Sequence, residues 1–165
     1  MSTRCQIGFY RKDEKDLNKW EALIYRHSDG YPEGVLPELL PFLKWFDKAR
    51  GMSDTEYVSA RCLQYLCNSY DGMTWEMAEK FTHVKDQISK DFTGVLGYGI
   101  CNGFHGDIEY FYAVYPKKVV VYSCGWDAKP EKWNMVKVID FALEEPLGII
   151  LEDCRRETEG ADIEG

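Results

Sequence analysis

Two short segments of the chain each place a histidine two residues before an aspartate. They are His27-Ser28-Asp29 and His105-Gly106-Asp107. In an extended backbone, residues i and i+2 project to the same side, so each segment offers an imidazole beside a carboxylate. If the two segments are neighbours in the fold, the four groups converge. Such a set suits a divalent metal with open positions, or acid–base chemistry near pH 7.

The same residues also have purely structural interpretations. Asp29 precedes Gly30 in a turn, where a carboxylate accepts backbone N–H bonds. His105 lies close to two glycines and fits a loop. Both interpretations stay open from the sequence. The residues that we assign to a binding site are His27, Asp29, Tyr31, His105 and Asp107.

Other motifs give no catalytic residue. The glycines between residues 94 and 106 do not match the spacing of nucleotide-binding loops, and the chain has no G-x-S-x-G elbow. The six cysteines include no C-x-x-C pair, which disfavours a zinc site or a redox motif. We therefore assign no catalytic residues and expect the cysteines to be buried apolar side chains.

Two strands are predicted to position the first histidine. Residues 3–10 alternate between apolar and polar side chains, which predicts a half-buried strand. Residues 20–27 predict a second strand, paired antiparallel with the first across the charged connector 11–19. The turn-forming residues 28–34 follow directly, so His27 should end a strand and Asp29 should lie in a rigid turn.

Two helices are expected after this turn. Apolar residues recur at helical spacing from about Val35, and Gly51 ends that helix. Pro41 should kink the helix or delay its start. A second helix over 55–70 follows Ser53 or Asp54 as its cap. Residues 74–92 predict a polar helix, or helix and loop.

Strands dominate the second half of the sequence. A strand is predicted over 95–101, and a hairpin over 107–115 and 118–124 turns at Pro116-Lys117. Residues 133–142 fit either a strand or a helix, and 149–151 fit a last turn or strand. We predict an α+β domain over residues 1–152, with helices on one face of an antiparallel sheet built from the N-terminal hairpin and the later meander. Residues 153–165 form an acidic tail that we expect to be flexible.

Length and charge narrow the function classes. The 165 residues favour one domain, and 45% hydrophobic residues argue against disorder. Residues 144–165 carry −6 of the net charge of −8, and a body at −2 disfavours nucleic-acid binding. No run approaches the ~18 apolar residues of a membrane span. Met1 to Tyr10 lack the apolar core of a signal peptide, so we expect a soluble cytoplasmic protein.

Aromatic residues on the predicted sheet suggest a contact surface. Tyr110 and Tyr112 alternate along one strand, and Trp126 follows nearby. On an uncovered sheet face these rings could stack a base or line a small-ligand cleft. They could equally form a protein contact, including a homodimer interface.

Two N-terminal segments together resemble a group of small uncharacterised proteins of phage and prokaryotic genomes. Those proteins open with T-R-[SC]-x-I and carry a Y-x-H-x-D-G-Y-P turn before a helix. Here the matching segments are Thr3-Arg4-Cys5-Gln6-Ile7 and Tyr25-Arg26-His27-Ser28-Asp29-Gly30-Tyr31-Pro32. The resemblance covers about the first 45 residues, with a longer connector in this chain. It implies no activity, but it implies a phage or mobile-element accessory protein.

The sequence therefore leads to two hypotheses. The first is a non-enzymatic binding protein without a cofactor, which holds an unknown protein or small-molecule partner at the turn and nearby aromatics. The second is a small metal-assisted hydrolase of a phosphate ester that uses the two His-x-Asp segments and a divalent metal. The distance between the two segments in the fold separates these hypotheses.

Overall fold

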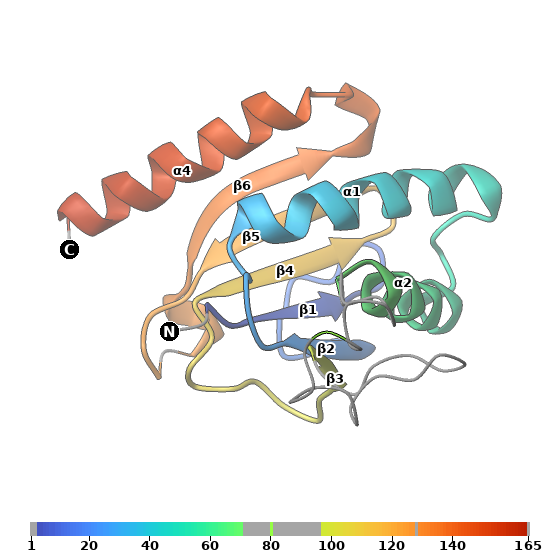
Figure 1. The fold of residues 1–165 in the computed structure, drawn as a ribbon, viewed down its shortest axis with the longest axis horizontal. Coiled ribbons are helices and arrows are strands. Elements are labelled where there is room, and N and C mark those ends of the chain that lie inside the picture. The colour runs from blue at the N-terminus through green and yellow to red at the C-terminus, as the bar shows by residue number, and fades with distance from the viewer. Residues whose placement is uncertain (1–2, 71–79, 81–96, 128, 165) are drawn as a thin grey trace.

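A six-stranded sheet forms the centre of the protein (Figure 1). The computed structural model describes residues 3–70, 80, 97–127 and 129–164. The strands are β1 (Cys5–Phe9), β2 (Ala22–Arg26), β3 (Tyr98–Ile100), β4 (Tyr110–Tyr115), β5 (Lys118–Ser123) and β6 (Asn134–Asp140). The helices are α1 (Pro32–Ala49), α2 (Thr55–Tyr70) and α4 (Leu147–Glu164), with short 3₁₀ helices η2 (Pro130–Lys132) and η3 (Phe141–Leu143).

The sheet is mixed, not purely antiparallel as predicted. Its strand order is β3-β2-β1-β4-β5-β6, and the central pair β1 and β4 is parallel. The other four pairs are antiparallel, including the predicted pairs β1–β2 and β4–β5. A parallel pair needs a long crossover connection, and the chain between β1 and β4 supplies it with α1 and α2. The α+β class is confirmed.

Strand β1 is buried on both faces, whereas its alternating sequence predicts one buried face. All five residues from Cys5 to Phe9 are buried. The side chains of Cys5, Ile7 and Phe9 join the core beneath the helices. Gln6 and Gly8 face the other side, where loops and aromatic rings cover them. The position of β1 inside the sheet causes this double burial.

One face of the sheet packs against α1, α2 and α4. Helices on one face were predicted, but α4 was not, because its residues were assigned to a last turn or strand and a flexible tail. The core on this face combines strand residues with apolar residues of all three helices, such as Leu39, Leu66 and Ile150. Helix α1 begins at Pro32, three residues earlier than expected. Proline lacks a backbone N–H and suits this first position. The prediction that Pro41 delays the start is wrong, because Pro41 lies inside α1.

The remaining elements settle several open assignments. Residues 133–142 contain strand β6 and the start of η3, which follows it. The acidic segment from residue 153 continues α4, and its Cys154 is buried, so this segment is helical where the sequence suggested a loose tail. The polar region 74–92 lies outside the described residues except for residue 80. Among the helices that the structure describes, none is long and apolar enough to cross a membrane.

A second, aromatic core covers the opposite face of the sheet. Phe111 lies at its centre, with the rings of Phe104 and Trp133 at 5.4 and 4.9 Å between centroids. Tyr10 and Tyr115 stack at 5.3 Å beside them. Loops, not helices, supply much of this cover. The histidine segments lie at the border of this second face.

Candidate functional site

Strand β2 divides its side chains between the two faces of the sheet. Ile24 and Arg26 belong to the helix face, while Leu23 and Tyr25 point to the loop face. His27 follows Tyr25 by two residues and stays on its side. The candidate site is therefore built on the loop face, at the end of β2.

Tyr25 contacts both of the predicted histidines. Its hydroxyl is hydrogen-bonded to Nδ1 of His27 at 3.0 Å. Its ring stacks on the ring of His105, with 4.6 Å between centroids and 21° between planes. Both histidines are exposed. The two His-x-Asp segments thus meet through a tyrosine, with His27 and His105 on either side of it.

Gln6 positions His105 from the centre of the sheet. The Gln6 side chain is fully buried, and its register partner in β2 is Tyr25. Its amide nitrogen donates to the carbonyl of Gly103 at 3.1 Å, and its oxygen accepts the backbone N–H of His105 at 3.0 Å. These two bonds hold residues 103–105 in the position from which the ring of His105 stacks on Tyr25.

Asp107 forms an ion pair with Arg4 beside the stacked rings. Burial raises the pKa of the Tyr25 hydroxyl, Arg4 opposes that rise, and Asp107 adds to it. Tyr25 therefore stays protonated at neutral pH, and its hydroxyl can donate a hydrogen bond to Nδ1 of His27. The carboxylate of Asp107 is committed to the guanidinium of Arg4, so it does not pair with the imidazole of His105 as the sequence pattern suggested.

Asp29 and Tyr31 form a hydrogen-bonded pair of their own. Asp29 has a φ of 54°, so the segment is not extended and the i, i+2 rule does not bring its carboxylate beside His27. The Tyr31 hydroxyl donates to Oδ1 of Asp29 at 3.2 Å, which raises the pKa of Tyr31. Gly30 packs against the start of β1, and its carbonyl accepts the hydroxyl of Tyr112 at 2.7 Å. These contacts hold the turn against β1 and β4, and the carboxylate of Asp29 accepts the hydroxyl of Tyr31.

The structure thus brings together His27, His105 and Asp107 around Tyr25 and Arg4, while Asp29 and Tyr31 are hydrogen-bonded to each other. Within the described ranges, no three His, Cys, Asp or Glu side chains gather in a way that could hold a metal ion. The four-group convergence that a metal-assisted hydrolase would need is not formed.

A pocket of about 580 Å³ opens beside His105. Its apolar walls are Phe104 and Pro130. Its polar lining comes from Asn18, His105, Asp127, Lys129 and Glu131. Asp127 lies against the loop because its N–H donates to the carbonyl of Gly106 at 2.7 Å. Neither carboxylate of this lining forms an ion pair with a described residue, so both can accept hydrogen bonds from a ligand.

Three residues of the site escaped the sequence analysis. Tyr25 could have been found, since strand periodicity puts it on the same side as His27. Arg4 and Gln6 lie on the side of β1 that the sequence identified as polar, but their partners are about a hundred residues away. Tyr110 and Tyr112 do not form the expected uncovered surface, because Tyr112 is fully buried in the core that the strands share with the helices.

Comparison of the chain with protein-family models, with curated proteins and with solved structures gives no match. These comparisons therefore supply no function, and the geometry of the site is the main basis for the proposal that follows.

Proposed function

We propose that this chain is a non-enzymatic binding protein that holds a small ligand with a flat, polar ring beside His105. One observation carries the proposal: His105 lines the pocket, and its ring stacks on Tyr25. A planar ligand placed against the other face of the imidazole would extend this stack. Aromatic rings favour such offset stacking at centroid distances of about 4.5–7 Å.

The pocket lining defines the polar part of the ligand. Asp127 and Glu131 are hydrogen-bond acceptors, Lys129 is a donor, and Asn18 is both. A heterocycle with ring N–H or amino groups satisfies these residues. The lining contains two carboxylates and one lysine, so its charge disfavours a phosphate-rich polymer. The chain's net charge of −8 points the same way. The pocket volume lies within the range of about 300–1,000 Å³ for small-molecule sites.

The proposal includes a background in phage or mobile elements. Its support is the resemblance of the segments Thr3-Arg4-Cys5-Gln6-Ile7 and Tyr25 to Pro32 to small proteins of such genomes. Arg4, Gln6, Tyr25 and His27 of these segments all belong to the site. A small accessory protein that binds a ligand or a host component fits this background.

Titration followed by NMR tests the proposal. Adenine, cytosine and nicotinamide are added to the full chain, with inorganic phosphate and ribose as non-aromatic controls. We expect at least one heterocycle to shift the ring resonances of His105, and neither control to do so. His105→Ala should abolish binding, whereas His27→Ala should retain most of it, because His27 does not line the pocket.

Tyr25→Leu provides a second variant that leaves the pocket walls in place. It removes the ring beneath His105, so heterocycle binding should weaken while circular dichroism stays native. The proposal fails if no heterocycle moves the His105 resonances up to about 10 mM, a range that detects fragment-sized ligands. It also fails if His105→Ala binds the heterocycles as well as the unmodified chain.

A further inference from the structure

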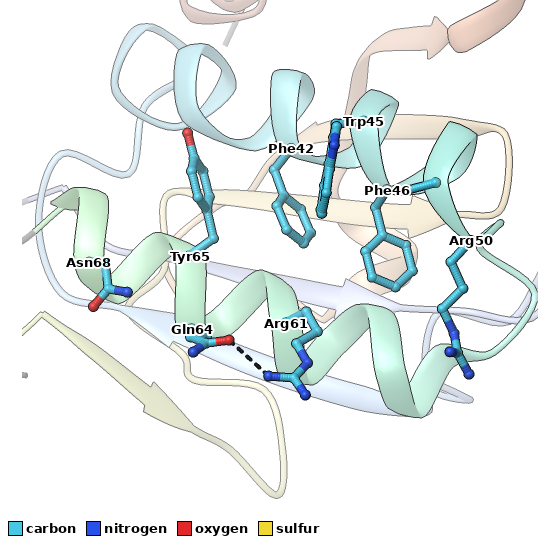
Figure 2. A pocket seen from close by; sticks show the side chains of 9 residues that line it. Phe42, Trp45, Phe46, Arg50, Arg61, Gln64, Tyr65 and Asn68 are labelled. Atoms are coloured by element: carbon cyan, nitrogen blue, oxygen red, sulfur yellow. Dashed lines mark hydrogen bonds between the residues drawn. The ribbon is translucent and has the colours of Figure 1, made fainter.

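An apolar groove lies between α1 and α2, on the helix side of the molecule and away from the ligand pocket. It encloses about 440 Å³. Figure 2 shows Phe42, Trp45 and Phe46 pointing from α1 toward α2, which lies opposite. Arg61 and Tyr65 of α2 line the other wall. The groove is thus formed by two neighbouring helices that leave aromatic surface between them.

Part of this aromatic surface is exposed to solvent. Trp45 is 62% exposed and Tyr65 37% exposed. The Tyr65 ring stacks on buried Phe42 at 5.2 Å, so the exposed ring continues the core outward. Contiguous exposed aromatic surface of this kind marks an interaction site more often than an isolated surface residue does.

The rim of the groove is positively charged. Arg50 and Arg61 both line it, and none of the described residues that line it is acidic. Arg61 donates to the amide oxygen of Gln64 at 3.1 Å and forms no ion pair with a described residue. Arg50 lies over the ring of Tyr57 and faces Asp54 at 3.9 Å. In a chain of net charge −8, this groove therefore favours an occupant that is apolar and acidic.

The same chain presents such an occupant at the corner between β6 and α4. Leu143 is 67% exposed at this corner, and Glu144 and Glu145 follow it directly. The corner is held firmly: Phe141 is buried, and Asp140 accepts the N–H of Ala142 at 2.9 Å.

Two further features fix the shape of the corner. Glu144 adopts a φ of 49°, in the left-handed region, and Lys137 binds the carboxylate of Glu145 at 3.0 Å. Glu144 has no ion pair with a described residue and is exposed. A rigid apolar tip with a free carboxylate loses little conformational entropy on binding.

The corner and the groove lie at the same end of the molecule. The N–H of Phe141 donates to the carbonyl of Lys117 at 3.0 Å, and the amine of Lys117 binds Asp47 near the end of α1 at 2.9 Å. Figure 1 shows the β6–α4 connection and the C-terminal end of α1 at the right of the view. Two copies that approach through this end can exchange corner and groove reciprocally.

We propose that a second copy of this chain occupies the groove. Leu143 of each copy inserts between Trp45 and Tyr65 of the other, and Glu144 faces Arg61. The two equal contacts are related by a two-fold axis, which closes the assembly as a dimer. Because each contact is small, the dimer dissociates on dilution. The ligand pocket beside His105 takes no part, so this inference is independent of the proposed function.

Sedimentation velocity on the full chain tests the dimer from about 1 µM to about 1 mM, a range that covers weak association. Leu143→Asp and Trp45→Ala should each weaken dimerisation at least about tenfold, which corresponds to about 1.4 kcal/mol. Lys12→Glu serves as the matched charge control, because Lys12 is exposed in the connector between β1 and β2. It should leave the dimer unchanged.

A charge exchange gives the sharpest readout. Arg61→Glu and Glu144→Arg should each shift the chain to monomer, and the double variant should restore the dimer. Circular dichroism and thermal melting show whether each variant is folded. A folded chain that stays monomeric at all concentrations would overturn the proposal and leave the groove to a different partner. A dimer that none of the four single substitutions in the groove and corner affects would overturn it equally.

Discussion

The buried side chain of Gln6 holds the backbone of His105, which lies 99 residues later in the chain, through a 3.0 Å bond from the His105 N–H. The same side chain binds the carbonyl of Gly103. The exposed end of the site thus depends on a buried amide in the central strand. Four predictions test this arrangement and the framework that supports it.

Gln6→Leu should move His105 away from Tyr25 and destabilise the fold. The substitution leaves two backbone groups of the loop without their partner, which costs about 1–3 kcal/mol for each buried group that stays unsatisfied. We expect altered ring resonances of His105 by NMR and a lower midpoint in urea denaturation. Gln64→Leu on the exposed side of α2 is the control and should change neither quantity. Native His105 resonances in the Gln6 variant would contradict the positioning role.

Gly30→Ala should destabilise the protein because there is no room for a methyl group. A Cβ at this position would lie 2.8 Å from Cβ of Cys5 and 2.9 Å from the carbonyl oxygen of Thr3. Overpacking of this kind costs about 1–3 kcal/mol. Gly99→Ala is the matched control, since its Cβ would meet nothing within 4 Å. Urea denaturation of both variants measures the difference, and equal stabilities would argue against a rigid turn.

Arg26→Ala should be the most damaging of these substitutions. The side chain is 2% exposed, and it donates to the carbonyl of Ser28 at 2.7 Å and to the hydroxyl of Tyr98 at 3.0 Å. Its partner Glu38 lies on α1 at 3.4 Å, so the guanidinium ties β2, β3 and α1 together.

Breaking a buried charge pair on one side costs about 3–5 kcal/mol. We expect a loss in the lower part of this range for Arg26→Ala, since Glu38 is partly exposed. Arg11→Ala removes a pair in which the arginine is largely exposed, and it should change stability by less than about 0.5 kcal/mol. Thermal or urea unfolding compares the two variants. Similar losses for both would show that the buried network contributes little.

Lys137→Met should remove a stabilising interaction that is lost at low pH, where Asp153 is protonated, and at high pH, where Lys137 is deprotonated. The hydrogen bond from Lys137 holds the pKa of Asp153 below its ordinary value of 3.8, and the same bond raises the pKa of Lys137 above 10.5. The contribution of Asp153 is present above pH 3.8 and is lost as the pH falls through its folded pKa. The contribution of Lys137 is present below pH 10.5 and is lost as the pH rises through its folded pKa.

The difference in unfolding free energy between wild type and Lys137→Met should therefore be constant from about pH 5 to about pH 9 and shrink outside this window. Urea denaturation at acid, neutral and alkaline pH measures it. Lys12→Met is the control and should show no such profile. If the difference in unfolding free energy stays the same at low pH, the bond to Asp153 is not what stabilises the fold through Lys137.

Local features of the fold could be predicted from the sequence. The hairpin around Pro116-Lys117 and the helix over 55–70 were recognised because their periodicity and turn residues act between near neighbours in the chain. The pairing of the first two strands was found for the same reason. Within the site, the sequence pattern identified His27, His105 and Asp107 by residue type alone.

Tertiary structure decided how these residues face one another. The parallel pairing of β1 with β4, the bond from Gln6 to His105 and the ion pair of Arg4 with Asp107 all join segments about a hundred residues apart. No local pattern encodes such contacts, because they depend on which strands become neighbours. The φ of 54° at Asp29 turned its carboxylate toward Tyr31, and the packing of Gly30 on β1 holds it there. The sequence by itself therefore determined which residue types are candidates for the site. Only the pairing of the strands determined which of their side chains contact one another.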